Sequence, residues 1–176
     1  MKEVMATVAD LMALSARTAP KAAGKDFVEI KVIKKGDELD KLADDMIKYG
    51  EESGKKNFDR DADNVRNSDV VVLIALNKPK TTGLNCGACG YPKCSELEKS
   101  FKEGSEFDGP ACAWRVIDLG IAIGSAVKTA SILNADNRIM YRIGVSAKRM
   151  KLVEGQVVVG IPISATGKSI YFDRKS

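Results

Sequence analysis

Apolar residues recur along the chain with two different periods, one typical of helices and one typical of strands. Residues 4–15 repeat apolar positions every three to four residues, which predicts an amphipathic helix. Residues 39–47 show the same period, whereas residues 27–33 are rich in β-branched side chains and predict a strand. The polar segment 51–67 is predicted to be a linker.

The centre of the predicted sheet is the continuous apolar run from Val70 to Leu76, the pattern of a strand covered on both faces. Residues 114–133 carry a long helical stripe with many small side chains, which predicts a nearly buried helix. Gly120 and Gly124 lie four positions apart on it, a spacing that permits close packing. Two further segments are short candidate strands: 140–143 and 157–161.

These elements predict a single α+β domain over residues 1–176, a sandwich of helices around a mixed or antiparallel sheet. With 44% apolar and 30% charged residues, a chain of this length can bury a core without disulfides. Residues 81–112 interrupt the pattern, because they are rich in Gly and Pro and short of periodic apolar positions. They are expected to form an insertion folded around a bound group.

Charge and composition exclude several classes of protein. The net charge is only +4, and the 28 basic residues are scattered among 24 acidic ones, which argues against nucleic-acid binding. The absence of histidine excludes Ser-His-Asp and Cys-His nucleophile arrangements. No apolar run reaches the roughly 20 residues that a membrane span needs, and no signal-peptide core is visible. We therefore expect a cytoplasmic protein with no membrane or nucleic-acid partner.

All four cysteines lie in the insertion, with the spacing Cys86-x2-Cys89-x4-Cys94-x17-Cys112. An iron-sulfur cubane needs several thiolates from a small arc of chain, with backbone N–H groups directed at its sulfurs. Gly87 and Gly90 allow the chain to turn closely enough to supply them. The spacing therefore predicts a 4Fe-4S cluster with these four cysteines as its ligands.

Structural zinc is the main alternative, because four cysteines also suit that ion. The usual zinc signature is two separated Cys-x2-Cys pairs, and this chain has only one such pair. Disulfides are disfavoured in a reducing compartment. The cluster is therefore the preferred interpretation.

The motif Asn-Cys-Gly-x-Cys-Gly-x3-Cys at residues 85–94, followed by Cys112, resembles the 4Fe-4S domain of electron-transfer complexes and corrinoid iron-sulfur proteins. Over nearly its whole length the chain also resembles a family of prokaryotic proteins described as containing a ferredoxin domain. The segments that carry this second resemblance are 15–21, 118–125 and 160–168. Both resemblances imply a redox protein.

The order of elements around the insertion is similar to that of the nitroreductase family. There, an N-terminal helix and a basic turn precede a hydrophobic strand, a long buried helix and a late strand ending in Gly-x-Pro. The resemblance implies a nitroreductase-like fold, an FMN cofactor and a homodimer. It also implies that Arg17 and Thr18 contact the flavin phosphate, for which a guanidinium beside a hydroxyl is well suited.

The segment after Thr18 has two interpretations. Pro20 stands where the nitroreductase family has a second arginine, so the second cation on a phosphate would come from Lys21, or from Lys168 and Arg174. Alternatively, residues 17–21 are simply a polar helix end that Pro20 terminates.

The sequence is consistent with two functions. In the first, the chain is an iron-sulfur redox protein that passes electrons to or from a second centre, FMN, with a redox partner protein; as an enzyme it would be an FMN-dependent oxidoreductase. In the second, a cluster or zinc only stabilises a non-enzymatic module that binds a partner. A bound flavin would distinguish the two.

Overall fold

The sheet is four-stranded, and every pair of neighbouring strands in it is antiparallel. The computed structural model describes residues 1–173. The strands are β1 (Val28–Lys34), β2 (Val70–Leu76), β3 (Asp136–Asn137) and β4 (Val157–Ser164), in the spatial order β1-β2-β4-β3. The expected α+β sandwich is confirmed, with an antiparallel sheet.

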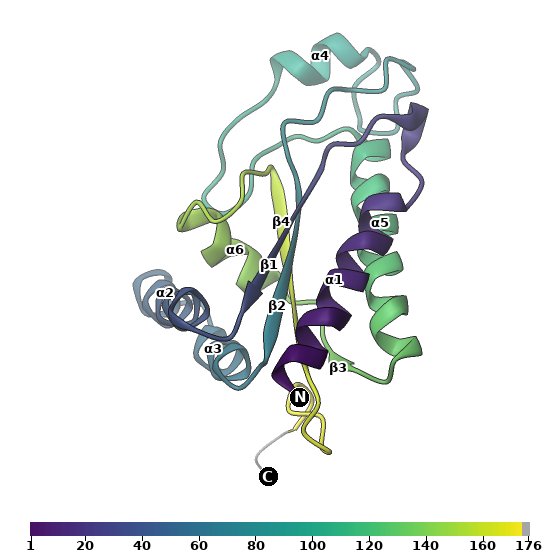
Figure 1. Ribbon diagram of the computed structural model, residues 1–176. Helices are drawn as coiled ribbons and strands as arrows, with labels where there is room; N and C mark the ends of the chain where they lie inside the picture. The colour runs from purple at the N-terminus through teal and green to yellow at the C-terminus, as the bar shows by residue number, and fades with distance from the viewer. Residues whose placement is uncertain (174–176) are drawn as a thin grey trace.

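Helices cover both faces of the sheet (Figure 1). One face carries α1 (Lys2–Thr18) and α5 (Ala113–Ile132); the other carries α2 (Asp37–Ser53), α3 (Phe58–Arg66) and α6 (Tyr141–Arg149). Two short elements lie at the end of the molecule where α5 begins: α4 (Cys94–Lys99) and the 3-10 turn η1 (Ala22–Gly24). The N-terminus lies at the opposite end in the same view.

Strand β2 is the centre of the structure, because every one of its residues is buried. Successive side chains of a strand point to opposite faces of the sheet. Leu73 therefore packs into the core formed with α2, α3 and α6, whereas Val72 and Ile74 pack into the core formed with α1 and α5. This confirms that the apolar run is a strand covered on both faces.

The predicted conformations of two segments are wrong. Residues 51–67 are not a linker: α2 extends to Ser53, and α3 then buries Phe58, Ala62 and Val65 at helical spacing. The segment 140–143 is not a strand, because Met140 only bridges to Gly160 and α6 follows at once. Both segments owe their conformation to burial of a narrow apolar stripe against the α2 side of the sheet.

Helix α5 is not nearly buried, contrary to the expectation from its apolar sequence. Half of its buried residues are alanine, whereas Val116, Ile117 and Ile121 are 43, 48 and 39% exposed. Gly120 and Gly124 are also exposed, and a Cβ atom added at either would meet no atom within 4 Å. Despite this apolar outer face, no helix within residues 1–173 is long and apolar enough to span a membrane.

Candidate iron-sulfur site

The cysteines lie in the excursion that leaves β2 and returns at the start of α5 (Figure 1). Cys86 and Cys89 are in the loop itself, Cys94 is the first residue of α4, and Cys112 is the residue that caps α5. Cys86 is exposed, Cys89 and Cys94 are partly exposed, and Cys112 is buried. The site would therefore extend from the surface to the end of the α1–α5 layer.

The loop that carries the first three cysteines turns through several left-handed residues. Gly83, Gly87 and Gly90 have φ values of 78°, 74° and 87°, a conformation that side chains rarely adopt. Asn85 also has a positive φ, 48°, which asparagine tolerates better than most residues. The two glycines of the motif thus form the close turns that were expected of them.

Asn85 and Cys94 form two hydrogen bonds with each other across this loop. The Asn85 backbone N–H donates to Cys94 Sγ at 3.4 Å, and Asn85 Oδ1 accepts from the Cys94 backbone N–H at 2.8 Å. This reciprocal contact positions one thiol and directs an N–H group at it. No role for Asn85 was predicted from the sequence, although asparagine directly before the first cysteine was a usable signal.

Cys112 lies in a setting that favours its thiolate. Burial alone would raise the pKa of the Cys112 thiol, but backbone N–H groups of Thr82, Arg115 and Trp114, together with the Thr82 hydroxyl, hold that pKa below its ordinary value. Thr82 Oγ1 lies 3.9 Å from the sulfur. Because the thiolate is the form that binds metals, this residue is suited to be a ligand.

The candidate ligands are all thiols. Across residues 1–173, no group of three His, Cys, Asp or Glu side chains is close enough to hold a metal ion. A mononuclear zinc centre would need all four sulfurs at about 2.3 Å from the same ion. In a cubane cluster each thiolate binds a different iron, so the ligands are spread around a larger object. The all-thiol donor set, with hydrogen-bonding groups at Cys94 and Cys112, suits an iron-sulfur cluster.

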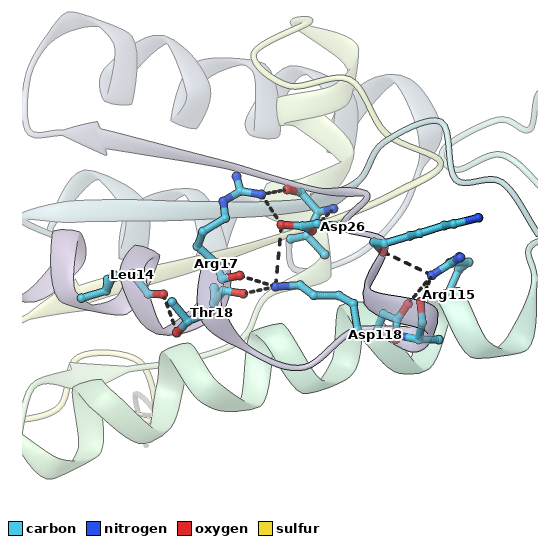
Figure 2. A network of polar contacts seen from close by, with 11 residues as sticks. Leu14, Arg17, Thr18, Asp26, Arg115 and Asp118 are labelled. Atoms are coloured by element: carbon cyan, nitrogen blue, oxygen red, sulfur yellow. Dashed lines mark hydrogen bonds and ion pairs between the residues drawn. The ribbon is translucent and has the colours of Figure 1, made fainter. Parts of the chain in front are cut away.

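A buried ion pair anchors the end of the cysteine segment (Figure 2). The Arg115 guanidinium donates to Asp118 Oδ2 at 2.9 Å, and also through Nε to the carbonyl of Lys80 at 2.9 Å. Nη1 reaches the carbonyl of Ala22 at 2.9 Å, while the Ala22 N–H donates to Asp118 Oδ1 at 2.7 Å. The pair thus ties the entrance of the cysteine segment and the turn after α1 to the helix that begins at Cys112.

Arg17 and Thr18, the predicted phosphate contacts, lie together at the end of α1 and are exposed (Figure 2). Arg17 Nη1 donates to Asp26 Oδ2 at 2.6 Å and to the carbonyl of Val28 at 2.7 Å. Thr18 Oγ1 donates back to the carbonyl of Leu14 at 3.1 Å. Arg17 therefore already contacts a carboxylate in this structure.

The other cations that were proposed to bind the phosphate are less available for it. Lys21 Nζ donates to the carbonyls of Ala16 and Arg17 at 2.8 and 2.5 Å, so it caps the end of α1. Lys168 pairs with Asp173 at 2.7 Å. Arg174 lies outside the described residues. The structure brings Arg17, Thr18 and Lys21 to one helix end. There, Thr18 and Lys21 both donate hydrogen bonds to backbone carbonyls.

Solved structures with the same fold include several nitroreductases. The FMN-dependent nitroreductase NfnB from Mycobacterium smegmatis, in complex with NADPH, matches with a TM-score of 0.60 and 10% identity, over 96% of this chain and 82% of that chain. The nitroreductase CinD from Lactococcus lactis, in complex with nicotinic acid, matches with a TM-score of 0.60 and 13% identity, over 90% and 77%. At this level of identity the likeness shows the nitroreductase fold.

Sequence relatives give a more specific result. Residues 83–106 match the family described as "Putative Fe-S cluster", which supports an iron-sulfur cofactor, and residues 108–174 match the family described as "Uncharacterized protein containing a ferredoxin domain". A protein of Archaeoglobus fulgidus described as uncharacterized is 51% identical over 164 residues, which cover 93% of this chain and 88% of that protein. The chain belongs to this family of ferredoxin-domain proteins and carries its iron-sulfur segment on a nitroreductase fold.

Proposed function

We propose that the protein is an iron-sulfur redox protein whose Cys86, Cys89, Cys94 and Cys112 hold a 4Fe-4S cluster used for electron transfer. The observation that carries the proposal is the pair of hydrogen-bonding groups around the last two ligands of the set. The Asn85 N–H donates to Cys94 Sγ at 3.4 Å, and the Thr82 hydroxyl lies 3.9 Å from Cys112 Sγ. Such groups stabilise the negative charge of cluster sulfurs and their ligands.

The cluster, when bound, would supply one-electron storage. The chain supplies everything else: glycine turns shape the loop, Asn85 fixes Cys94, and the Arg115–Asp118 pair fixes the helix that begins at Cys112. Exposed Cys86 would place the site close to the surface, where a redox partner protein could exchange electrons with it. Free cysteines of this kind suit a reducing, cytoplasmic compartment.

A role as an FMN-dependent oxidoreductase is the second candidate, and a specific observation favours it. Arg17 uses only Nη1 for its contacts within residues 1–173, and its side chain is 51% exposed. The remaining nitrogens could therefore bind a phosphate, in competition with the Asp26 carboxylate. The fold that this chain shares with FMN-dependent NfnB is consistent with such a site.

A homodimer is also proposed, through the outer face of α5. Glycine inside an exposed helix costs about 1 kcal/mol relative to alanine, and neither Gly120 nor Gly124 has a neighbour within residues 1–173 that would require it. With Ile117 and Ile121 beside them, they would allow the α5 helix of a second copy to approach closely. Light scattering should report a dimer, and Ile121→Asp should convert it to a monomer; a monomeric wild type would contradict the proposal.

The ligand assignment is tested by measuring iron, acid-labile sulfide and zinc in anaerobically purified protein and in each single Cys→Ser variant. We expect about four irons and four sulfides per chain in the wild type, and loss or conversion of the cluster in every variant. One zinc per chain without sulfide would favour the non-enzymatic module instead. A variant that keeps full iron and sulfide would remove that cysteine from the ligand set.

A further inference from the structure

The long interval between Cys94 and Cys112 contains a closed loop, residues 102–109. The Lys102 N–H donates to the Gly109 carbonyl at 2.6 Å, and the Gly109 N–H donates to the Lys102 carbonyl at 3.0 Å. This reciprocal pair of bonds closes the base of the loop in the manner of an antiparallel bridge. The connection between the third and fourth candidate ligands is therefore folded rather than slack.

The tip of the loop is tight and packs against α6. A Cβ atom at Gly104 would lie 2.1 Å from the Phe107 carbonyl oxygen, so only glycine fits there. The Phe107 ring centroid lies 6.2 Å from that of Tyr141, the first residue of α6, and Phe107 packs against the core on that side. Asp108 pairs with Lys148 of α6 at 2.6 Å. The loop therefore has one compact shape and one docking position.

Glu106, between these two residues, has the most contacts of the loop with the helices on that side of the sheet. Its Oε1 accepts from the Tyr49 hydroxyl of α2 at 2.9 Å and from Lys55 Nζ, just after α2, at 2.8 Å. The Tyr141 hydroxyl lies 3.4 Å from both carboxylate oxygens. The Glu106 side chain is only 13% exposed. One carboxylate thus joins the cysteine segment to α2 and α6.

The surroundings of Glu106 keep its carboxyl group charged at neutral pH. Burial alone would raise the pKa of the Glu106 carboxyl, but hydrogen bonds from Lys55 and Tyr49 hold that pKa below its ordinary value. Hydrogen bonds to an ionised group are stronger than those between neutral groups. The contact therefore holds the loop more firmly than a neutral side chain at this position would.

Cys112 follows the loop closely. Only Pro110 and Ala111 separate it from Gly109, and a chain this short spans at most about 11 Å. Pro110, Ala111 and Cys112 line the same cavity. On the other side of Cys112, the Arg115–Asp118 pair fixes the start of α5. The position of Cys112 is thus constrained from both directions along the chain, and Glu106 supplies the constraint on the N-terminal side.

We propose that the 102–109 loop sets the position of Cys112 relative to the other three cysteines, and that Glu106 is the positioning residue that keeps this loop docked. Cys112 is only 8% exposed, whereas Cys86 is exposed. Release of Glu106 from α2 and α6 would expose the Cys112 thiol and let the fourth ligand move away from the others. The consequence for a cluster rests on the proposed function; the movement of the loop does not.

The docking is tested by alkylation of the full-length chain with iodoacetamide after iron has been removed with a chelator. Mass spectrometry follows each cysteine separately. In Glu106→Ala, Cys112 should react about tenfold faster than in the wild type, because alkylation of a buried thiol follows the population of the open form, while Cys86 should change less than about twofold. The matched control is Glu38→Ala, which breaks the exposed ion pair with Lys31 at 2.6 Å. A wild-type rate at Cys112 in Glu106→Ala, or an equal increase in Glu38→Ala, would overturn the proposal.

Hydrogen exchange distinguishes release of the loop from general unfolding. In Glu106→Ala, exchange should rise in residues 102–112 and stay unchanged in residues 70–76 of β2. An equal rise in both segments would contradict a local role for Glu106. Glu106→Gln keeps the size of the side chain and serves if the alanine variant does not fold. Cys112 should react about threefold faster in it than in the wild type, and an unchanged rate would contradict the role of the carboxylate.

The protein with its cluster provides the second readout. Glu106→Ala should release iron to a chelator about fivefold faster than the wild type and should alter the EPR spectrum of the dithionite-reduced cluster, whereas Glu38→Ala should change neither. If Cys112 became more reactive while iron release and the spectrum stayed the same, the loop would not control the fourth ligand. A protein without a cluster would contradict the proposed function, while alkylation would still decide whether Glu106 holds the loop.

Discussion

Arg115 Nη1 lies 2.9 Å from Asp118 Oδ2, one turn beyond Cys112, and both side chains are almost wholly inaccessible to solvent. Taking two charges out of water is costly, so such a pair is retained only where further hydrogen bonds satisfy it. Here those bonds come from the carbonyls of Lys80 and Ala22 and from the Ala22 N–H, and only Arg115 Nη2 is left without a partner among residues 1–173. The pair therefore fixes the position of the cysteine segment relative to α5.

Arg115→Met should destabilise the protein by about 3 to 5 kcal/mol, because it leaves the Asp118 carboxylate buried without its partner. Urea unfolding gives the free energy. The double variant Arg115→Met, Asp118→Leu should recover part of the loss, since no isolated charge then remains. As a control, Lys48→Ala on the exposed Lys48–Glu52 pair of α2 should cost at most about 1 kcal/mol. Equal costs for Arg115→Met and Lys48→Ala would contradict the role given to the buried pair.

The parts of the fold that the sequence predicts well are those with a single dominant signal. Seven consecutive apolar residues at 70–76 leave little alternative to a buried strand, and the structure confirms it. The short run 140–143 carries no dominant signal, because four residues fit a strand or a helix turn equally well. Only the buried pair of Ile143 and Ala147, four residues apart, reveals the helix.

Other elements were missed because their stabilising contacts are distant in sequence. In α3, three apolar residues among many charges give a weak signal until the core of α2 and α6 covers them. In α5, both faces are apolar, so sequence alone does not indicate that Ala122 and Ala126 face inward while Ile117 and Ile121 face outward. The cysteine spacing identifies the candidate ligands, but the anchoring contacts of Arg115 come from segments 35 and 93 residues away.

Stability should fall at alkaline pH because of Tyr171. Burial, the main cause, raises the pKa of the Tyr171 hydroxyl from its ordinary value of 10 to about 12, and this hydroxyl contacts Ser68 at 2.9 Å. The folded state therefore holds this proton more tightly than the unfolded chain. The stabilisation that the protonated hydroxyl provides is complete below about pH 10 and is lost as the pH approaches 12. A shift of about two pH units corresponds to about 2 to 3 kcal/mol.

The matched variant for this prediction is Tyr171→Phe, which removes the titrating group. Free energies of unfolding measured across the alkaline range should fall more steeply with pH in the wild type than in Tyr171→Phe. Parallel curves would mean that Tyr171 does not control the alkaline transition.

Asn85 should control how firmly the cluster is held. In Asn85→Ala the acceptor for the Cys94 N–H is lost, which costs about 1 kcal/mol and should speed iron release to a chelator about fivefold. Asn85→Asp keeps an acceptor oxygen at the same place and should release iron at nearly the wild-type rate. Iron release is followed by the absorbance of the chelate; equal rates in the two variants would show that this hydrogen bond has no role in retention.

FMN binding should depend on Arg17 and Asp26 in opposite directions. Loss of a charge-assisted contact costs about 1.5 to 3 kcal/mol, so Arg17→Ala should weaken FMN binding about ten- to hundredfold. Asp26→Asn should strengthen it, because the phosphate no longer competes with a carboxylate for the Arg17 guanidinium. Quenching of flavin fluorescence measures both affinities.

The outcomes of that titration are readily separated. No binding of FMN by the wild type would make Arg17 a structural residue that closes the turn after α1 onto Asp26. Binding that neither substitution alters would place the flavin elsewhere on the chain.

EPR spectroscopy of anaerobically purified protein tests most directly whether Cys86, Cys89, Cys94 and Cys112 hold a redox-active 4Fe-4S cluster. The spectrum is recorded before and after reduction with dithionite. We predict no signal in the protein as purified and, after reduction, a signal that accounts for about one unpaired electron per chain. Iron-free protein, or a cluster that dithionite leaves without a signal, would contradict the claim.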